Sequence, residues 1–164
     1  MSKFLIHPSY FPSIATFAVL AQKDIVWEAH DNFQKQTYRN RMFIYAANGK
    51  LLLNIPVKHD KQGNKIKYTD IQIENIENWQ KQHWKSIESA YRTSPFFEYY
   101  EDDIKDIFFT PQTSLFEMNM NIFNTLCECI ELETSVSFSG TFVKDYGEEE
   151  TVDMRNLVLA KKGV

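Results

Sequence analysis

Two short apolar segments near the N-terminus, each followed directly by polar residues, constrain the fold of this chain most strongly. Residues 3–6 (KFLI) precede His7, and residues 24–29 (DIVWEA) precede His30 and Asp31. Ser13 can cap a short helix between the two segments. The apolar residues of this helix recur at helical spacing, namely Ile14, Phe17, Ala18 and Ala21. This order predicts a βαβ unit, with parallel strands joined by a right-handed crossover.

The middle of the chain predicts a β-hairpin. Asn48-Gly49 is a strong hairpin signal between the apolar residues 43–46 and 51–57. Residues 66–73 alternate between apolar and polar side chains, which favours a further strand.

Helical patterns then dominate the second half. They cover about residues 76–92, a segment from Phe96 through Ile104, and residues 115–130, with Ser94 and then Thr113 or Ser114 as N-caps. Residues 135–138 favour a short strand, and the acidic tail is weakly patterned. The predicted fold class is α/β: an N-terminal βαβ unit with parallel strands, an inserted β-hairpin and a mainly helical C-terminal half, in a single domain over residues 1–164.

Composition excludes several classes of protein. The chain has 164 residues, of which 43% are hydrophobic and 24% charged, as in ordinary globular proteins. It has no charged-then-apolar leader and no apolar run of about 20 residues, which predicts no membrane span. The two cysteines, Cys127 and Cys129, are too close to close a useful loop and too few for a structural zinc site. We therefore expect a reduced, cytoplasmic protein, and the sequence assigns no set of metal ligands.

Charge is unevenly distributed. Residues 33–67 contain eight Lys or Arg and one acid, whereas residues 98–153 contain fourteen acids and two lysines. A basic stretch beside the polar loops suits an anionic small ligand such as a nucleotide or nucleotide sugar, although lysines also protect exposed strand edges. The net charge of −4 and the lack of a recognised motif predict no nucleic-acid partner.

The loops after the two predicted strands contain the first candidate site residues. In an open α/β sheet, ligands bind outside the carboxyl ends of the strands. His7 could act there as a general base or hydrogen-bond a ligand, or it could bond a neighbouring loop carbonyl. Asp31 could bind a sugar hydroxyl, a metal or an amine, or it could cap the following turn.

Cations and a second histidine complete the candidate set. Lys35, Asn40 and Arg41 could bind an anionic group such as a diphosphate, as could Arg39, and Arg favours two-point contact. His83 and Tyr91 lie on one face of the predicted helix 76–92, where a histidine is usually part of the core.

Several of these residues carry a family resemblance. They are residues 7–12 (HPSYFP), Asp31 with the following Gln and Lys residues, Asn40-Arg41, Trp79 with His83, Tyr91, and residues 95–97 (PFF). This pattern resembles the WbqC-like protein family. The resemblance implies His7, Asp31 and His83 as catalytic candidates, and Lys35, Asn40, Arg41 and Tyr91 as ligand-binding candidates. It also implies association with bacterial surface-polysaccharide (O-antigen) clusters and a proposed transfer of glycine or an aminoacyl group. No cofactor is implied.

The chain departs from the family pattern in two places. Ala15-Thr16 stand where a Gly-Tyr pair is expected, and the chain ends at Val164, earlier than expected. If a final apolar segment normally completes the core, apolar surface at Met154, Leu157, Val158 and Leu159 would be uncovered. That surface predicts a homodimer, and the alternative is a disordered tail.

Three functions remain open at this point. The first is a transferase acting on a nucleotide-linked sugar or an activated amino acid. The second is a nucleotidylyltransferase-like protein, although residues 13–16 lack the histidine of that signature. The third is a non-catalytic binding or scaffold subunit of a biosynthetic complex. For a transferase, we expect one cavity at the carboxyl ends of the strands, lined by His7, Asp31, Asn40, Arg41 and His83.

Overall fold

A computed structural model describes residues 2–147 and 150–160. The predicted βαβ unit is present: β1 (Lys3–Ile6) pairs in parallel with β2 (Ile25–Trp27), with Phe4 opposite Ile25. Two more parallel strands complete a sheet in the order β5-β2-β1-β6, with β5 at Val136–Phe138 and β6 at Thr151–Asp153. The predicted α/β class is confirmed.

Helix α1 (Ile14–Leu20) connects β1 and β2. Its predicted N-cap is correct, because the Ser13 hydroxyl accepts a hydrogen bond from the Thr16 amide. The predicted apolar face is correct only at Phe17, which packs on the core of the sheet. Ile14 is 91% exposed, and Thr16 and Leu20 are the buried residues of the helix. The buried Thr16 hydroxyl is bonded to Ser13, which offsets the loss of its contact with water.

The described part of the tail, residues 150–160, packs into the fold. β6 lies beside β1, and it leads into the short 3-10 helix η2 (Arg155–Val158). Val158 is buried and its carbonyl accepts a hydrogen bond from the Tyr38 amide, while Met154 and Leu157 pack on the core of the sheet. Only Leu159 of the four residues expected to be uncovered is exposed. The apolar surface on which a homodimer was predicted is therefore mostly covered within the chain.

A separate two-stranded antiparallel hairpin follows β2, as predicted. It consists of β3 (Arg41–Ala46) and β4 (Gly49–Asn54), joined at Ala47-Asn48. Gly49 follows the turn with a φ of 103°, a conformation that L side chains rarely adopt.

The predicted strand at residues 66–73 is not formed. The segment instead makes isolated bridges around the 3-10 helix η1 (Tyr68–Asp70), including Val57 with Ile73. The reason is tertiary: the Tyr68 ring is fully buried and its amide donates to the Asp31 carbonyl, which bends the segment away from a ladder.

Three helices form most of the second half: α2 (Trp79–Tyr91), α3 (Phe97–Phe109) and α4 (Leu115–Cys129). Ser114 caps α4 through the Glu117 amide, as predicted. Ser94 does not cap α3. Phe96 occupies that position with a left-handed φ of 65°, and the Ser94 carbonyl accepts from the Phe97 amide instead.

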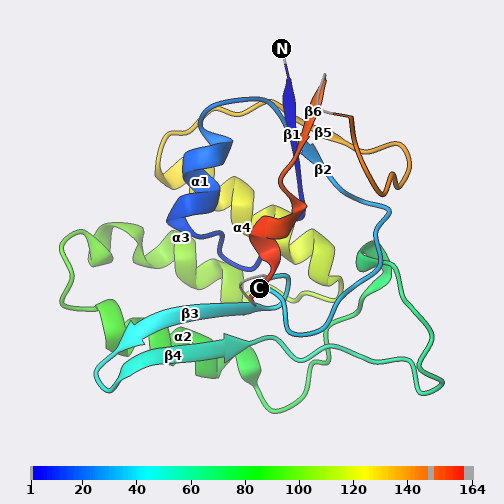
Figure 1. The fold of residues 1–164 in the computed structure, drawn as a ribbon. Coiled ribbons are helices and arrows are strands. Elements are labelled where there is room, and N and C mark those ends of the chain that lie inside the picture. The colour runs from blue at the N-terminus through cyan, green and yellow to red at the C-terminus, as the bar shows by residue number, and fades with distance from the viewer. Residues whose placement is uncertain (1, 148–149, 161–164) are drawn as a thin grey trace.

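Helix α4 joins the two parts of the molecule. Figure 1 shows the sheet on one side of α4 and the hairpin, with α2 and α3, on the other. Met118 and Ile122 of α4 pack in the core of the hairpin and helices, whereas Phe123 and Cys127 pack under the sheet. None of the helices in the described ranges is long and apolar enough to cross a membrane.

Candidate functional site

Charged side chains gather at the carboxyl ends of the parallel strands. His7 follows β1, Glu28 and Asp31 follow β2, and Asp153 ends β6. The Glu28 amide donates to the Ile6 carbonyl, so the ends of β1 and β2 are in register. Together with Arg39 and Arg155, these four residues are called the sheet-edge cluster below.

His7, Asp31 and Arg39 form the centre of this cluster. The His7 Nε2 lies 3.1 Å from the Asp31 Oδ2, and the Arg39 guanidinium lies 3.6 Å from the same oxygen. The His7 and Arg39 side chains are 2% and 1% exposed, whereas Asp31 is 16% exposed. Asp31 is thus the member of the three that solvent or a ligand can reach.

The environment keeps His7 neutral and Asp31 ionised. Burial lowers the pKa of His7, against the opposing effect of its hydrogen bond with Asp31. Burial acts to raise the pKa of Asp31, but the His7 contact, the Asn32 amide and the Arg39 charge outweigh it, and the pKa is lowered. Neutral His7 therefore donates from Nε2 to the carboxylate, and its Nδ1 carries the lone pair.

A second charged group lies beside the first. Glu28 is fully buried; its Oε1 accepts from the His30 amide and from the Ser139 hydroxyl, which follows β5. Arg155 lies 3.6 Å from the Glu28 Oε2 and makes a close ion pair with Asp153. All four strands of the sheet therefore contribute a polar group at this edge.

Buried hydrogen bonds hold the loop after β1 in place. The Tyr68 hydroxyl donates to the Pro8 carbonyl at 2.7 Å, and the Asn119 amide of α4 donates to both the Tyr68 hydroxyl and the Arg39 carbonyl. The helix that joins the two cores thus fixes the position of Arg39. Within the described residues, three buried atoms of the cluster lack a hydrogen-bond partner: His7 Nδ1, Glu28 Oε2 and Arg39 Nε.

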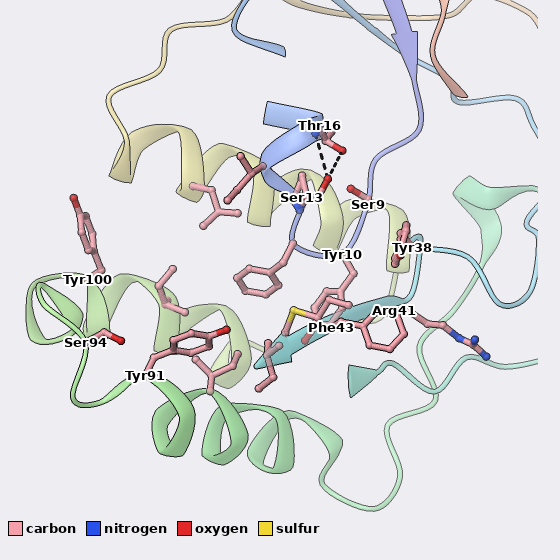
Figure 2. Close-up of a pocket in the computed structure, with 18 of the residues that line it drawn as sticks. Ser9, Tyr10, Ser13, Thr16, Tyr38, Arg41, Phe43, Tyr91, Ser94 and Tyr100 are labelled. Carbon is pink, nitrogen blue, oxygen red and sulfur yellow. Dashed lines mark hydrogen bonds between the residues drawn. The ribbon is translucent and has the colours of Figure 1, made fainter. Parts of the chain in front are cut away.

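A cavity of about 750 Å³ lies on the hairpin side of the same loop. Figure 2 shows Ser9, Tyr10 and Ser13 above it and Tyr91 below it, with Arg41 and Tyr100 at opposite ends. Apolar side chains make up most of its lining, including Phe11, Met42, Ile44, Ile87, Phe97, Ile104, Leu126 and Leu157.

The predicted site residues do not line one cavity, so that expectation is wrong. Arg41 and Tyr91 line the cavity, whereas His7, Asp31, Asn40 and His83 do not. The Asn40 side chain donates to the Ile55 carbonyl and to Asn54, so it ties β3 to the end of β4. Lys35 is exposed.

His83 is buried on α2 between Tyr10 and Trp79. It is 5% exposed, and its Nδ1 accepts a hydrogen bond of 2.8 Å from the Tyr10 hydroxyl. Burial lowers its pKa to about 4, against a hydrogen bond with the Asn54 backbone. The arrangement holds Tyr10, and with it the loop after β1, against α2.

Sequence reasoning missed Glu28, Arg155 and Asp153 as members of the cluster. Glu28 could have been noticed, because an acid that ends an apolar strand points to the carboxyl edge of the sheet. Asp153 and Arg155 gave no signal, since neither β6, which ends at Asp153, nor η2, which begins at Arg155, was predicted. No group of three or more His, Cys, Asp and Glu is arranged to hold a metal ion in the part of the chain that the structure describes.

Comparison with known proteins now identifies the family. The sequence pattern of the WbqC-like protein family matches residues 7–162. The chain belongs to this family. It is 25% identical over 150 residues to the uncharacterized protein Rv1507c of Mycobacterium tuberculosis, an alignment that covers 89% of this chain and 63% of that protein. No solved structure matches the chain.

Proposed function

We propose that this chain is a group-transfer enzyme whose acceptor binds at Asp31. The acceptor is a nucleotide-linked sugar that presents an amino or hydroxyl group to the carboxylate. The transferred glycine or aminoacyl group comes from an activated amino acid, whose activating group leaves as the new bond forms. Transfer of glycine or another aminoacyl group during surface-polysaccharide assembly is the form of this reaction that the family resemblance favours.

The observation that carries the proposal is the partly exposed Asp31 carboxylate, held by a buried histidine and a buried arginine at the carboxyl edge of a parallel sheet. The lowered pKa keeps the Asp31 carboxylate ionised at neutral pH, and an ionised carboxylate accepts charge-assisted hydrogen bonds. It can orient an amine or hydroxyl for attack, and it stabilises the positive charge that develops on an attacking amine.

His7 and Arg39 act in this proposal as positioning residues. Their side chains are buried behind Asp31, so they fix its rotamer and keep it ionised rather than contact the acceptor from solvent. His83 is bonded to Tyr10 and Asn54, so its role in the proposal is to position the loop.

A thermal-shift screen of nucleotides, nucleotide sugars and amino acids tests the proposal. A ligand at one hundred times its dissociation constant stabilises the protein by about 2.7 kcal/mol, which raises the melting temperature by several degrees. We expect Asp31→Asn to reduce the affinity for the ligand about tenfold or more, because a hydrogen bond to a charged group is lost. Asp102→Asn, on the exposed face of α3, removes the same charge and should leave affinity unchanged. No shift with any member of the panel, or equal binding by Asp31→Asn, would contradict the proposal.

A further inference from the structure

The cavity between the loop after β1 and the hairpin has no role in the function proposed above. Its volume of about 750 Å³ falls within the range of roughly 300–1,000 Å³ that small-molecule sites have. Apolar side chains from α1, β3, α2, α3 and α4 converge on this space, which is partly open to solvent. Water in such a space gains few hydrogen bonds, which favours an apolar occupant.

Cations are placed at one part of the rim. Arg41 and Phe43 are two residues apart on β3, so their side chains leave the same face of the strand. The Lys50 Nζ, from β4, lies 3.9 Å from the centroid of the Phe43 ring. Two positive groups therefore flank Phe43, which itself lines the cavity.

No acidic side chain among the described residues neutralises these two cations. Arg41 bonds the neutral Asn54 side chain, and among residues 2–147 and 150–160 neither Arg41 nor Lys50 takes part in an ion pair. Glu101, the acid of the cavity lining, is paired with Arg92 at 2.8 Å. The rim thus presents positive charge beside an apolar interior.

We propose that this cavity binds an amphipathic anion, with an alkyl chain among the apolar side chains and a phosphate or carboxylate between Arg41 and Lys50. The occupant is a free molecule in solution, taken up one at a time, rather than the surface of a bilayer. The proposal is independent of the chemistry at Asp31, because Asp31 does not line the cavity.

Titration with monomeric alkyl phosphates tests whether the cavity binds an alkyl chain. Burial of each added methylene contributes about 0.8 kcal/mol, which corresponds to an affinity gain of about fourfold for each methylene from octyl to dodecyl phosphate. Ile104→Trp fills the cavity and should weaken binding of dodecyl phosphate tenfold or more. Lys105→Trp places the same side chain on the exposed face of α3 and should bind as the wild type does.

The head group is tested by charge variants. Wild-type protein should bind dodecyl phosphate more tightly than dodecanol, and Arg41→Gln and Lys50→Gln should each reduce this preference. Lys58→Gln makes the same charge change on an exposed residue outside the cavity, and should not reduce it. Equal affinity for the phosphate and the alcohol in the wild type would overturn the assignment of an anion.

A second readout does not depend on any variant folding. Methyl-labelled wild-type protein with dodecyl phosphate should show intermolecular NOEs to Ile87, Ile104 and Leu157, and none to Ile25 in the core of the sheet. Binding to anionic vesicles without binding to the monomeric phosphate would overturn the proposal in favour of a membrane surface. Asp31→Asn should bind the alkyl phosphate normally, so failure here and failure of the proposed transfer reaction are distinguishable.

Discussion

The sheet-edge cluster and the cavity share one loop, yet they differ in almost every physical property. Residues 7–12 contribute His7 to the cluster and Ser9 to Pro12 to the cavity wall. In the cluster, His7, Glu28 and Arg39 are buried and paired with other charged groups, and the Asp31 and Asp153 carboxylates are partly exposed. The cavity is instead an apolar space with two cations at its rim, Arg41 and Lys50, for which the described residues provide no ion-pair partner. A short motif can therefore serve two regions when its backbone forms the boundary between them.

Removing an arginine should change the free energy of unfolding much more in the cluster than at the cavity rim. Arg39→Met leaves the Asp31 carboxylate without its arginine and removes a buried cation, which should lower the free energy of unfolding by about 4 kcal/mol. Arg41→Met removes a cation that bonds a neutral side chain near solvent, so the expected loss is below about 1 kcal/mol. Urea unfolding followed by circular dichroism measures both. Equal losses in the two variants would show that the cluster is no more charge-dependent than the cavity rim.

Acid should destabilise the protein through its buried histidines. His83 has a pKa of about 4 in the folded chain against an ordinary value of 6.5, so the unfolded chain takes up a proton first as the pH falls. The free energy of unfolding should therefore decrease between pH 6.5 and pH 4, by about 3 kcal/mol in total from this residue. His7, whose pKa is also lowered, adds a loss of the same sign.

His83→Asn tests this assignment, because its side chain can still accept from Tyr10 but does not titrate. The decrease in unfolding free energy between pH 6.5 and pH 4 should be distinctly smaller in this variant than in the wild type. An identical pH dependence in both proteins would show that His83 is not held neutral by the fold.

Two tyrosine hydroxyls provide a smaller comparison. Tyr68→Phe removes the bond to the Pro8 carbonyl and leaves buried polar groups unpaired, which should lower the free energy of unfolding by about 2 kcal/mol. Tyr91→Phe removes only an exposed bond from the Tyr45 amide, with an expected loss below about 0.5 kcal/mol. Thermal denaturation shows which of the two variants loses more stability. A larger loss in Tyr91→Phe would mean that contacts on the cavity side, rather than the Tyr68 hydroxyl, hold the loop after β1.

Local patterns predicted the elements that local forces determine. Ser13 and Ser114 cap their helices as expected, and Asn48-Gly49 marks the hairpin. The predictions failed where distant contacts decide: burial of the Tyr68 ring bends the segment predicted as a strand, and β6 exists because it pairs with β1.

The sequence likewise predicted only part of the candidate site. His7 and Asp31 were predicted as site residues because ligands bind outside the carboxyl ends of parallel strands. In the structure their side chains are paired. The separation of Arg41 and Tyr91 from that pair was not predictable, because it depends on the side of the loop to which the hairpin docks. Arg155 enters the cluster through tertiary contacts with Glu28 and with the carbonyls of Val143 and Lys144.

An NMR titration tests most directly whether a substrate-like ligand binds at Asp31. NMR of labelled protein can follow the Asp31 carboxyl carbon, the His7 imidazole and the Ile104 and Leu157 methyl groups during titration with the nucleotide sugar or amino acid that gives the largest thermal shift. We expect the Asp31 and His7 signals to move with ligand concentration while the signals of the cavity methyl groups stay unchanged. Movement of the Ile104 and Leu157 signals with an unchanged Asp31 carboxyl signal would contradict this expectation.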